Sequence, residues 1–375
     1  MERYLGEHTP KLGFGLMRLP TSDDGSIDIE QTKQMVDLFM GAGLTYFDTA
    51  YVYGDGASER AAKEALVDRY PRDSFTLATK LNAWLGKPDE DSAKRQLEIS
   101  LERTGAGYFD YYLLHALQKN NRDIYDSYGL WDFVREQKAK GLIRHWGFSF
   151  HASPELLDEL LTLHPDAEFV QLQLNYADWE DPKVASRRCW EVARKHNKPV
   201  VVMEPVKGGR LANPVPQLQK VFRDADPDAS FASWAIRFAA SLDGILTVLS
   251  GMSTVEQVRD NISFMKDFRP LSETERAVVR QAQETLGSIE SIPCTACRYC
   301  TEGCPMGIPI PDIFAARNKQ LVWNMQEQGA KDYRKLAESG AAADACIACG
   351  QCEGACPQQI NIIERLRECA EHFAT

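Results

Sequence analysis

The stretch LTYFDTAYVYGDGASERAAKEALV, residues 44–67, contains one strand-and-helix unit with polar residues between its two halves. Residues 44–50 form a short apolar run typical of a buried parallel strand, and residues 58–67 place apolar side chains at helical spacing. Asp48 closes the expected strand, and Tyr53 lies in the loop that follows it. Ligands of parallel α/β folds bind at the carboxyl ends of the strands, so further polar site residues are expected at the ends of the other strands.

The same alternation recurs eight times over the first 270 residues. Strands are expected at residues 12–19, 44–50, 75–80, 108–116, 143–150, 169–175, 199–206 and 244–251. Helices are expected at residues 29–40, 58–67, 93–103, 124–140, 154–163, 184–196, 229–241 and 255–268. Eight strands, each followed by a helix, predict an α/β fold of the (β/α)8 TIM barrel type. A doubly wound open sheet is the alternative, but the first strand lacks the Gly-rich dinucleotide loop of that fold.

Polar residues stand at three consecutive strand ends of this predicted barrel. Lys80 closes the third strand and His115 lies near the end of the fourth, so both follow the Asp48 unit directly. Each residue alone could be structural, but barrel active sites lie at this end of the strands, and we interpret the four as one site. A neighbouring Lys80 ammonium would lower the pKa of Tyr53, and Asp48 would keep that ammonium charged. Tyr53 would then protonate a carbonyl oxygen to which His115 donates a hydrogen bond.

The motifs that contain these residues resemble the catalytic motifs of the aldo/keto reductases: YFDTAYVYGDGASE (46–59), LATK (77–80) and YYLLH (111–115). The resemblance covers residues 4–268 and agrees in motif order and spacing. It implies NAD(P)-dependent interconversion of a carbonyl and an alcohol, with NADP(H) as the expected cofactor and NAD(H) as the alternative. Residues 4–20 resemble the short hairpin and first strand that open the family's barrel.

The resemblance also implies cofactor-binding residues in four motifs, GFS (147–149), VQLQLN (170–175), EPVKGGRL (204–211) and SGMSTVEQVRDN (250–261). GFS and VQLQLN correspond to the residues that hold the nicotinamide carboxamide, and Asn175 follows at the carboxyl end of the strand that contains Gln171. EPVKGGRL corresponds to the loop beside the pyrophosphate, and SGMSTVEQVRDN to the segment near the adenosine, where backbone amides at a helix start approach an anion. The residues implied are Ser149, Gln171, Asn175, Gly208, Gly209, Arg210, Gly251, Ser253, Gln257 and Asn261.

Four positions depart from the family pattern. Phe150 replaces a common Asn, and Met203 replaces the aromatic residue that often stacks on the nicotinamide. Gly251 and Gln257 stand where many members carry Lys or Arg for a 2′-phosphate. The choice between NADPH and NADH is therefore open.

Two cysteine runs near the end of the chain share one spacing. CTACRYCTEGCP (294–305) and CIACGQCEGACP (346–357) both read C-x2-C-x2-C-x3-C-P. Bacterial ferredoxins with two 4Fe-4S clusters use this spacing, and the fourth cysteine of each run ligates the other cluster. One cluster is therefore expected on Cys294, Cys297, Cys300 and Cys356, and the second on Cys346, Cys349, Cys352 and Cys304.

Zinc is the alternative metal, but zinc sites use C-x2-C pairs rather than triplets followed by Cys-Pro. Residues 310–345, between the runs, are rich in helix formers and lack strand alternation, so we expect a mainly α-helical ferredoxin-like unit. The other two cysteines, Cys189 and Cys369, are interpreted as buried apolar residues. The predicted domains are a barrel at 1–270, a linker helix at 271–290 and an iron-sulfur domain at 291–375.

Bulk properties agree with a two-domain globular protein. The chain has 375 residues, more than one hydrophobic core usually contains. A net charge of -11 disfavours nucleic-acid binding. The first 15 residues contain no apolar run of the length that a signal peptide or membrane span needs, so we expect a cytoplasmic protein without membrane contact. A reducing compartment also favours metal binding over disulfides for the clustered cysteines.

Three functions are consistent with these features. The first is an oxidoreductase acting on a small carbonyl or alcohol, with clusters that relay electrons to or from a partner protein. The second is an NADPH carbonyl reductase whose clusters only stabilise a small domain. The third is a non-catalytic binding or regulatory subunit, which the four polar residues disfavour. A hydride carries two electrons and a cluster passes one, and the sequence shows no flavin site to link them.

Overall fold

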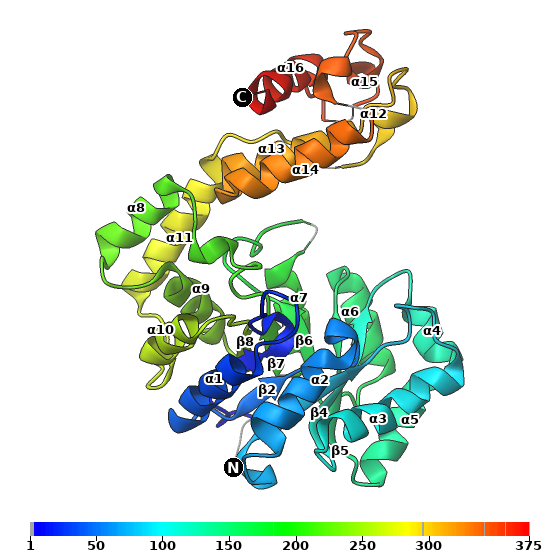
Figure 1. Ribbon diagram of the computed structural model, residues 1–375, viewed down its shortest axis with the longest axis vertical. Coiled ribbons are helices and arrows are strands. Elements are labelled where there is room, and N and C mark those ends of the chain that lie inside the picture. The colour runs from blue at the N-terminus through cyan, green and yellow to red at the C-terminus, as the bar shows by residue number, and fades with distance from the viewer. Residues whose placement is uncertain (1–3, 183, 295, 341, 357, 375) are drawn as a thin grey trace. The chain divides into compact units, whose positions relative to one another are not determined.

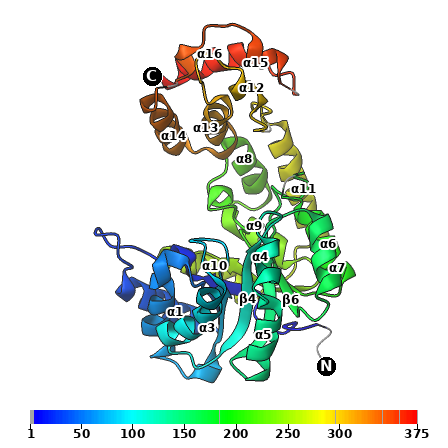
Figure 2. The same ribbon diagram turned by 90° about the vertical axis from the view of Figure 1, so that its right-hand side faces the viewer.

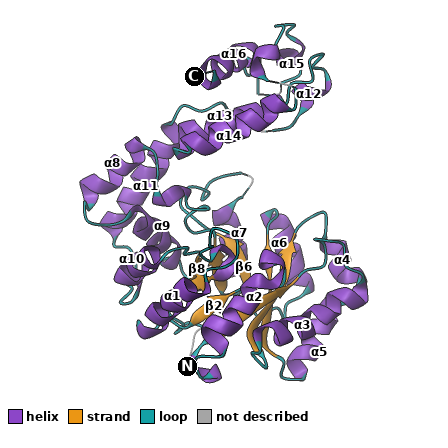
Figure 3. Ribbon diagram, in the orientation of Figure 1, coloured by secondary structure: helices purple, strands orange, loops and turns teal. Residues whose placement is uncertain are grey.

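Eight parallel strands close into a barrel in sequence order in the computed structural model, which describes residues 4–182, 184–294, 296–340, 342–356 and 358–374. The (β/α)8 prediction is confirmed, and Figure 3 shows the strands gathered in one barrel surrounded by helices. The strands are β1 (Leu12–Gly15), β2 (Tyr46–Asp48), β3 (Thr76–Leu81), β4 (Phe109–Leu117), β5 (Ile143–Phe150), β6 (Phe169–Gln173), β7 (Val200–Met203) and β8 (Ile245–Ser250).

Amphipathic helices pack around this barrel (Figure 1). They are α1 (Ile29–Gly41), α2 (Ala57–Ala62), α3 (Glu90–Thr104), α4 (Arg122–Ser127), α5 (Leu130–Ala139), α6 (Pro154–Leu163), α7 (Ser186–Lys195), α9 (Phe231–Ala240) and α10 (Val255–Met265), followed by α11 (Glu273–Ser288). Side chains of Asp28, Ser153 and Thr254 accept hydrogen bonds from the first turns of α1, α6 and α10, so these helices begin where the sequence supplies N-caps. None of the described helices has the length and apolar character needed to cross a membrane.

Three local expectations were wrong. The helix expected at 124–140 is divided into α4 and α5, because Gly129 between them adopts a left-handed conformation with φ 59°. The first strand ends at Gly15, and Leu16–Arg18 form a 3-10 turn instead of continuing it. The described residues of the expected N-terminal hairpin form turns without strand pairing, closed by bonds such as Thr9 N–H to the Gly6 carbonyl.

The alternation of side chains along each strand explains where polar side chains can lie inside the barrel. A buried cluster inside the barrel contains Tyr46, Ala78, Tyr111, Leu113, Phe169, Val201, Leu246 and Leu249. Side chains two residues apart on a strand point to the same face. Asp48, Lys80, His115 and Gln171 each follow a member of this cluster by two residues, one layer nearer the carboxyl ends of the strands. The apolar layer therefore fills the interior, and the next layer along the strands is polar.

A second compact unit consists of Gly209–Phe231 together with Arg280–Thr375. This division differs from the predicted boundaries, because the segment after β7, including α8 (Pro216–Ala225), groups with the C-terminal residues. The unit further contains α12 (Tyr299–Glu302), α13 (Ile310–Trp323), α14 (Gln326–Glu338), α15 (Gln351–Gly354) and α16 (Ile362–Phe373). Figure 2 shows α13 beside α14, as in Figure 1. The described residues of the second unit form helices and loops without strands, which confirms the α-helical prediction.

Both cysteines outside the two runs are buried, as predicted. Cys189 belongs to the core around the barrel and Cys369 to the core of the second unit. Burial raises the pKa of Cys189 to about 12 and that of Cys369 to about 11. Neither thiol is therefore activated, since reactivity requires the thiolate.

Candidate active site and cysteine pockets

Lys80 lies at the centre of the polar layer and uses all three of its ammonium hydrogens. Nζ donates to Asp48 Oδ1 at 2.5 Å, to the Thr49 carbonyl at 2.6 Å and to Tyr53 Oη at 3.4 Å. Lys80 and Asp48 are almost completely buried, with side-chain exposures of 0% and 4%. A buried charge needs a partner and satisfied hydrogen bonds, and this arrangement supplies both for the ammonium.

Tyr53 and His115 are half-buried and lie on the open side of this pair. Their rings meet edge to face with centroids 5.8 Å apart. Because Lys80 donates to the phenol oxygen, the Tyr53 O–H remains able to donate to a ligand. His115 Nδ1 is buried and has no hydrogen-bond partner among the described atoms. The structure thus brings all four predicted residues together with donor capacity left over.

The position of His115 depends on a local break in β4. The pairing of β4 with β5 shifts register between Leu114 and Leu117, and Ala116 has φ 56°. Ser149 Oγ accepts a hydrogen bond from Ala116 N–H at 2.7 Å. Trp84 Nε1 and the Tyr125 hydroxyl both donate to the His115 carbonyl. The alternation along β4 places the imidazole in the polar layer, and these bonds hold the backbone where the strand pairing is interrupted directly after it.

Burial dominates the electrostatics of the site. It raises the pKa of Tyr53 above its ordinary value, since the opposing effect of Lys80 is smaller and Asp48 and Glu204 add to the rise. Burial thus outweighs Lys80, which lowers the pKa of Tyr53 as expected but does not make the phenol more acidic than a free tyrosine. Burial, followed by the charge of Lys80, holds the pKa of His115 well below its usual range, which keeps the imidazole neutral.

The pKa values of the ion pair itself follow the same competition. Burial alone lowers the pKa of Lys80, but the charge of Asp48 and the hydrogen bonds to Asp48 and Tyr53 raise it overall. Burial raises the pKa of Asp48 against the pull of Lys80. The high pKa of Lys80 keeps the ammonium protonated at neutral pH, as the sequence predicted.

Two of the residues implied to bind nicotinamide also lie in the polar layer. Gln171 Oε1 is buried without a hydrogen-bond partner among the described atoms, and its Nε2 reaches only Met203 Sδ at 3.6 Å. Ser149 is buried one strand away. Asn175 differs, because its side chain bonds to Asp178 through both ends and to the Glu204 carbonyl. The amide of Gln171 and the hydroxyl of Ser149 thus fit a carboxamide, whereas Asn175 is used to shape the loop.

The implied phosphate and adenosine residues follow β7 and β8 in the sequence. Gly208 and Gly209, with φ 64° and 91°, follow β7, and Arg210 in the second unit lies 5.7 Å from the Trp323 ring centroid. Around α10, Gln257 Oε1 accepts from Ser253 N–H at 2.7 Å, and Asn261 Nδ2 donates to Ser250 Oγ at 2.7 Å. The exposed Gly251 follows β8 directly.

Arg18 and Glu204 are two further polar residues near the site that the strand-end argument did not include. Arg18 ends the 3-10 turn after β1, and Glu204 follows β7 with φ 55°. Arg18 Nη2 lies 3.5 Å from Glu204 Oε1. The sequence did contain a signal for these two residues, in MRLP (17–20) and MEPV (203–206). If the strand-end argument had been applied to all eight strands, it would have selected Arg18 and Glu204 as well.

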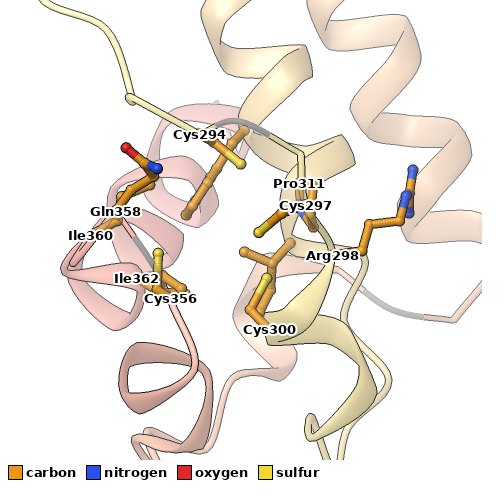
Figure 4. Close-up of a pocket in the computed structure, with 11 residues that line it drawn as sticks. Cys294, Cys297, Arg298, Cys300, Pro311, Cys356, Gln358, Ile360 and Ile362 are labelled. Atoms are coloured by element: carbon orange, nitrogen blue, oxygen red, sulfur yellow. The ribbon is translucent and has the colours of Figure 1, made fainter.

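The cysteine runs form two pockets in which their fourth members are exchanged. Cys294, Cys297 and Cys300 of the first run line one pocket with Cys356 of the second run. Figure 4 shows the sulfur atoms of these four residues turned toward a common space. Cys346, Cys349 and Cys352 line the other pocket with Cys304. This is the grouping that the ferredoxin spacing predicted; Pro357, at the end of the second motif, lies outside the described residues.

The pockets fit a polynuclear cluster better than single ions. Apart from the cysteines, the walls of both pockets are mainly apolar, and Ile310 is common to both. No three His, Cys, Asp or Glu side chains among the described residues form a group able to hold one metal ion. Four separated thiolates around an apolar space match the donor set of a 4Fe-4S cluster rather than that of zinc.

Comparisons with known proteins agree with both parts of the chain. Residues 11–284 match the Aldo/keto reductase family, and residues 293–360 match a 4Fe-4S dicluster domain. The uncharacterized oxidoreductase YqkF of Bacillus subtilis is 24% identical over 286 residues, which cover 67% of this chain and 86% of that protein. Aflatoxin B1 aldehyde reductase member 4 of Homo sapiens is 28% identical over 193 residues, and the chain spans about half of its length, 47%.

Solved structures share the barrel fold. The aldo-keto reductase AKR11C1 of Bacillus halodurans, in its holo form, superposes with a TM-score of 0.59 at 24% identity, covering 75% of this chain and 95% of that one. An aldo/keto reductase of Klebsiella pneumoniae in complex with NADP and acetate gives a TM-score of 0.60 at 22% identity, covering 73% and 92%.

Proposed function

The chain belongs to the aldo/keto reductase family and carries a C-terminal 4Fe-4S dicluster domain, and from this premise we propose that it is an NAD(P)H-dependent oxidoreductase. Its reaction is the interconversion of a small carbonyl compound and the corresponding alcohol. The single observation that supports this most is the hydrogen bond from Lys80 Nζ to Tyr53 Oη at 3.4 Å, because a phenol oxygen that accepts from Lys80 keeps its own proton for donation.

We assign proton transfer to Tyr53. Burial keeps the phenol protonated at neutral pH, so it serves as the acid when a carbonyl oxygen gains electron density. The Lys80 ammonium then stabilises the phenolate that remains, and Asp48 holds the ammonium in place. His115, neutral and half-buried, donates a second hydrogen bond to the same oxygen. Positioned acid catalysis of this kind contributes about 10²- to 10⁴-fold.

NAD(P)H, when bound, supplies the hydride. The unpartnered Gln171 Oε1 and the nearby Ser149 hydroxyl are the groups that fit a nicotinamide carboxamide. The complex of the Klebsiella relative with NADP supports NADP(H) as the cofactor, and NAD(H) is the second candidate.

We further propose that the eight cysteines hold two 4Fe-4S clusters, which supply one-electron transfer when bound. Two features favour a relay to or from a partner protein. Ile310 forms a wall of both pockets, so the two sites are adjacent, and Cys297 and Cys349 are each exposed at the edge of one pocket. A purely structural role is the second candidate, because Cys300 and Cys352 are buried members of the unit's own core. A partner containing flavin would link one- and two-electron chemistry.

The catalytic part is tested by Tyr53→Phe in the anaerobically purified protein with a panel of aldehydes and ketones. We expect reduction to fall by about 10²- to 10⁴-fold, since only the acid is removed. Tyr70→Phe is the matched control, because that hydroxyl bonds to Asp37 on the outside of the barrel. Unchanged turnover in Tyr53→Phe would support the non-catalytic subunit instead.

The relay is tested by rapid-mixing absorbance spectroscopy of the full chain during turnover, with a one-electron donor or acceptor supplied in place of the partner protein. Cluster absorbance that changes at the rate of substrate conversion supports a relay. Absorbance that stays constant while substrate is consumed supports the structural role.

A further inference from the structure

We propose that Arg18 is a ligand for the diphosphate of the nicotinamide dinucleotide, an inference that rests on the proposed function. None of the cofactor motifs includes this residue. Three features of Arg18 support the assignment: where its side chain lies, which charges surround it and which other cations are already engaged.

Arg18 lies against both loops that the motifs place beside the cofactor's phosphates. A side-chain carbon added at Gly251 would come within 3.4 Å of Arg18 Cδ, and one added at Gly208 would come within 3.6 Å of Arg18 Nη2. The Arg18 backbone is attached to the same region, since its carbonyl accepts from Ser253 Oγ at 2.6 Å. Arg18 therefore spans from the loop after β8 to the loop after β7.

The two glycines leave this strip of backbone open. Gly208 and Gly251 are exposed, and neither carries a side chain that would cover the guanidinium. Gly208 has φ 64°, a conformation that other residues adopt only at a cost. Open backbone beside an arginine is suited to a phosphate group, which takes hydrogen bonds from both N–H groups and a planar guanidinium.

The guanidinium of Arg18 forms only a weak ion pair. Its ion pair with Glu204 spans 3.5 Å, and the two side chains are 49% and 35% exposed. Exposed pairs of this kind contribute little. Lys207, by contrast, bonds to the buried Asp178, and Arg210 packs over the Trp323 ring. A doubly charged diphosphate can therefore replace Glu204 as the partner of Arg18.

This assignment is compatible with the absence of a cation at Gly251 and Gln257. A ligand of the diphosphate binds NADPH and NADH alike, whereas a ligand of the 2′-phosphate would select NADPH. Arg18 is thus expected to contribute affinity without selecting between the two dinucleotides.

The test is fluorescence titration of the full chain with NADPH and, separately, with NADH, which requires no turnover. We expect Arg18→Ala to raise the Kd for both by about 10- to 100-fold, as for the loss of one charged hydrogen-bond donor. Arg18→Lys should recover part of the affinity. Glu204→Gln should tighten binding by up to about fivefold, because it removes the competing carboxylate. The control is Arg135→Ala, which removes an arginine of the outer helix α5 that pairs with Asp166. This variant should bind both nucleotides as the wild type does.

Three results would overturn the inference. Equal affinities of Arg18→Ala and wild type for both nucleotides would exclude any role in binding. Weakening confined to NADPH would move Arg18 to the 2′-phosphate and exclude the diphosphate. Weaker binding of both nucleotides by Glu204→Gln would show that the ion pair itself supports the site and that the diphosphate does not replace Glu204. A wild-type chain that binds neither nucleotide would instead remove the proposed function itself.

Discussion

Lys80 Nζ and Asp48 Oδ1 lie 2.5 Å apart in a part of the barrel from which solvent is excluded. Two charges at such a distance in a buried site depend on each other, because removing either one leaves the other uncompensated. The pair therefore has two separable roles, one in the stability of the barrel and one in holding the ammonium beside Tyr53.

Lys80→Met should separate these roles. We expect a loss of about 3–5 kcal/mol in the free energy of unfolding, since Asp48 stays buried without its partner. Carbonyl reduction should fall by about 10²-fold or more, as the phenolate of Tyr53 loses its counter-charge. Denaturant unfolding and steady-state turnover measure the two effects. In Lys80→Met/Asp48→Asn, stability should recover while activity stays low; activity that returns with stability would contradict the catalytic role of Lys80.

The pH dependence of carbonyl reduction should show a late alkaline limb. Reduction requires the protonated phenol, and burial raises the pKa of Tyr53 above that of a free tyrosine, near 10. We therefore expect kcat/KM to stay constant from neutral pH to about pH 10 and to decline only as pH rises further. An alkaline limb between about pH 7 and pH 8 would show that Lys80 outweighs burial.

Stability in mild acid should depend on His115. Burial holds the pKa of His115 well below its usual range, so below about pH 6.5 the unfolded chain takes up a proton that the folded chain excludes. The free energy of unfolding then falls as pH is lowered, by up to about 1.4 kcal/mol per pH unit for one proton.

Comparing denaturant unfolding at about pH 7.5 and about pH 5.5, on either side of the ordinary histidine pKa, measures this effect. The difference between the two pH values should shrink in His115→Gln. The exposed His8 provides the control, since His8→Gln removes an imidazole from the surface. An equal pH difference in wild type and His115→Gln would mean that His115 is protonated in the folded protein.

The exchange of the fourth cysteines predicts an unusual pattern of iron content. Cys297→Ser/Cys356→Ser removes two ligands of the same pocket and should leave about four of about eight irons per chain. Cys297→Ser/Cys304→Ser removes two cysteines of the same run, but from different pockets, and should deplete both clusters. Iron and sulfide analysis after anaerobic purification decides between them. The opposite pattern would mean that each run binds its own cluster.

Much of the barrel was predictable because its determinants are local. Apolar runs, helical periodicity and caps such as Ser153 occur within short segments, and they located all eight strands. Errors arose where one residue changes the backbone, as at Gly129 within the helix expected at 124–140. The assignment of residues 209–231 to the second unit was not predictable, since it depends on packing between segments distant in the sequence.

The site divides in the same way. The sequence by itself determined which residues could take part, because the spacing of Asp48, Tyr53, Lys80 and the cysteine runs follows from strand ends and from a cluster-binding motif. Only the tertiary structure decided how they act. Burial is a property of the packed barrel, and it reverses the expected shift of the Tyr53 pKa. The pairing of Arg18 with Glu204 likewise joins the segments that follow β1 and β7, which meet only when the barrel closes.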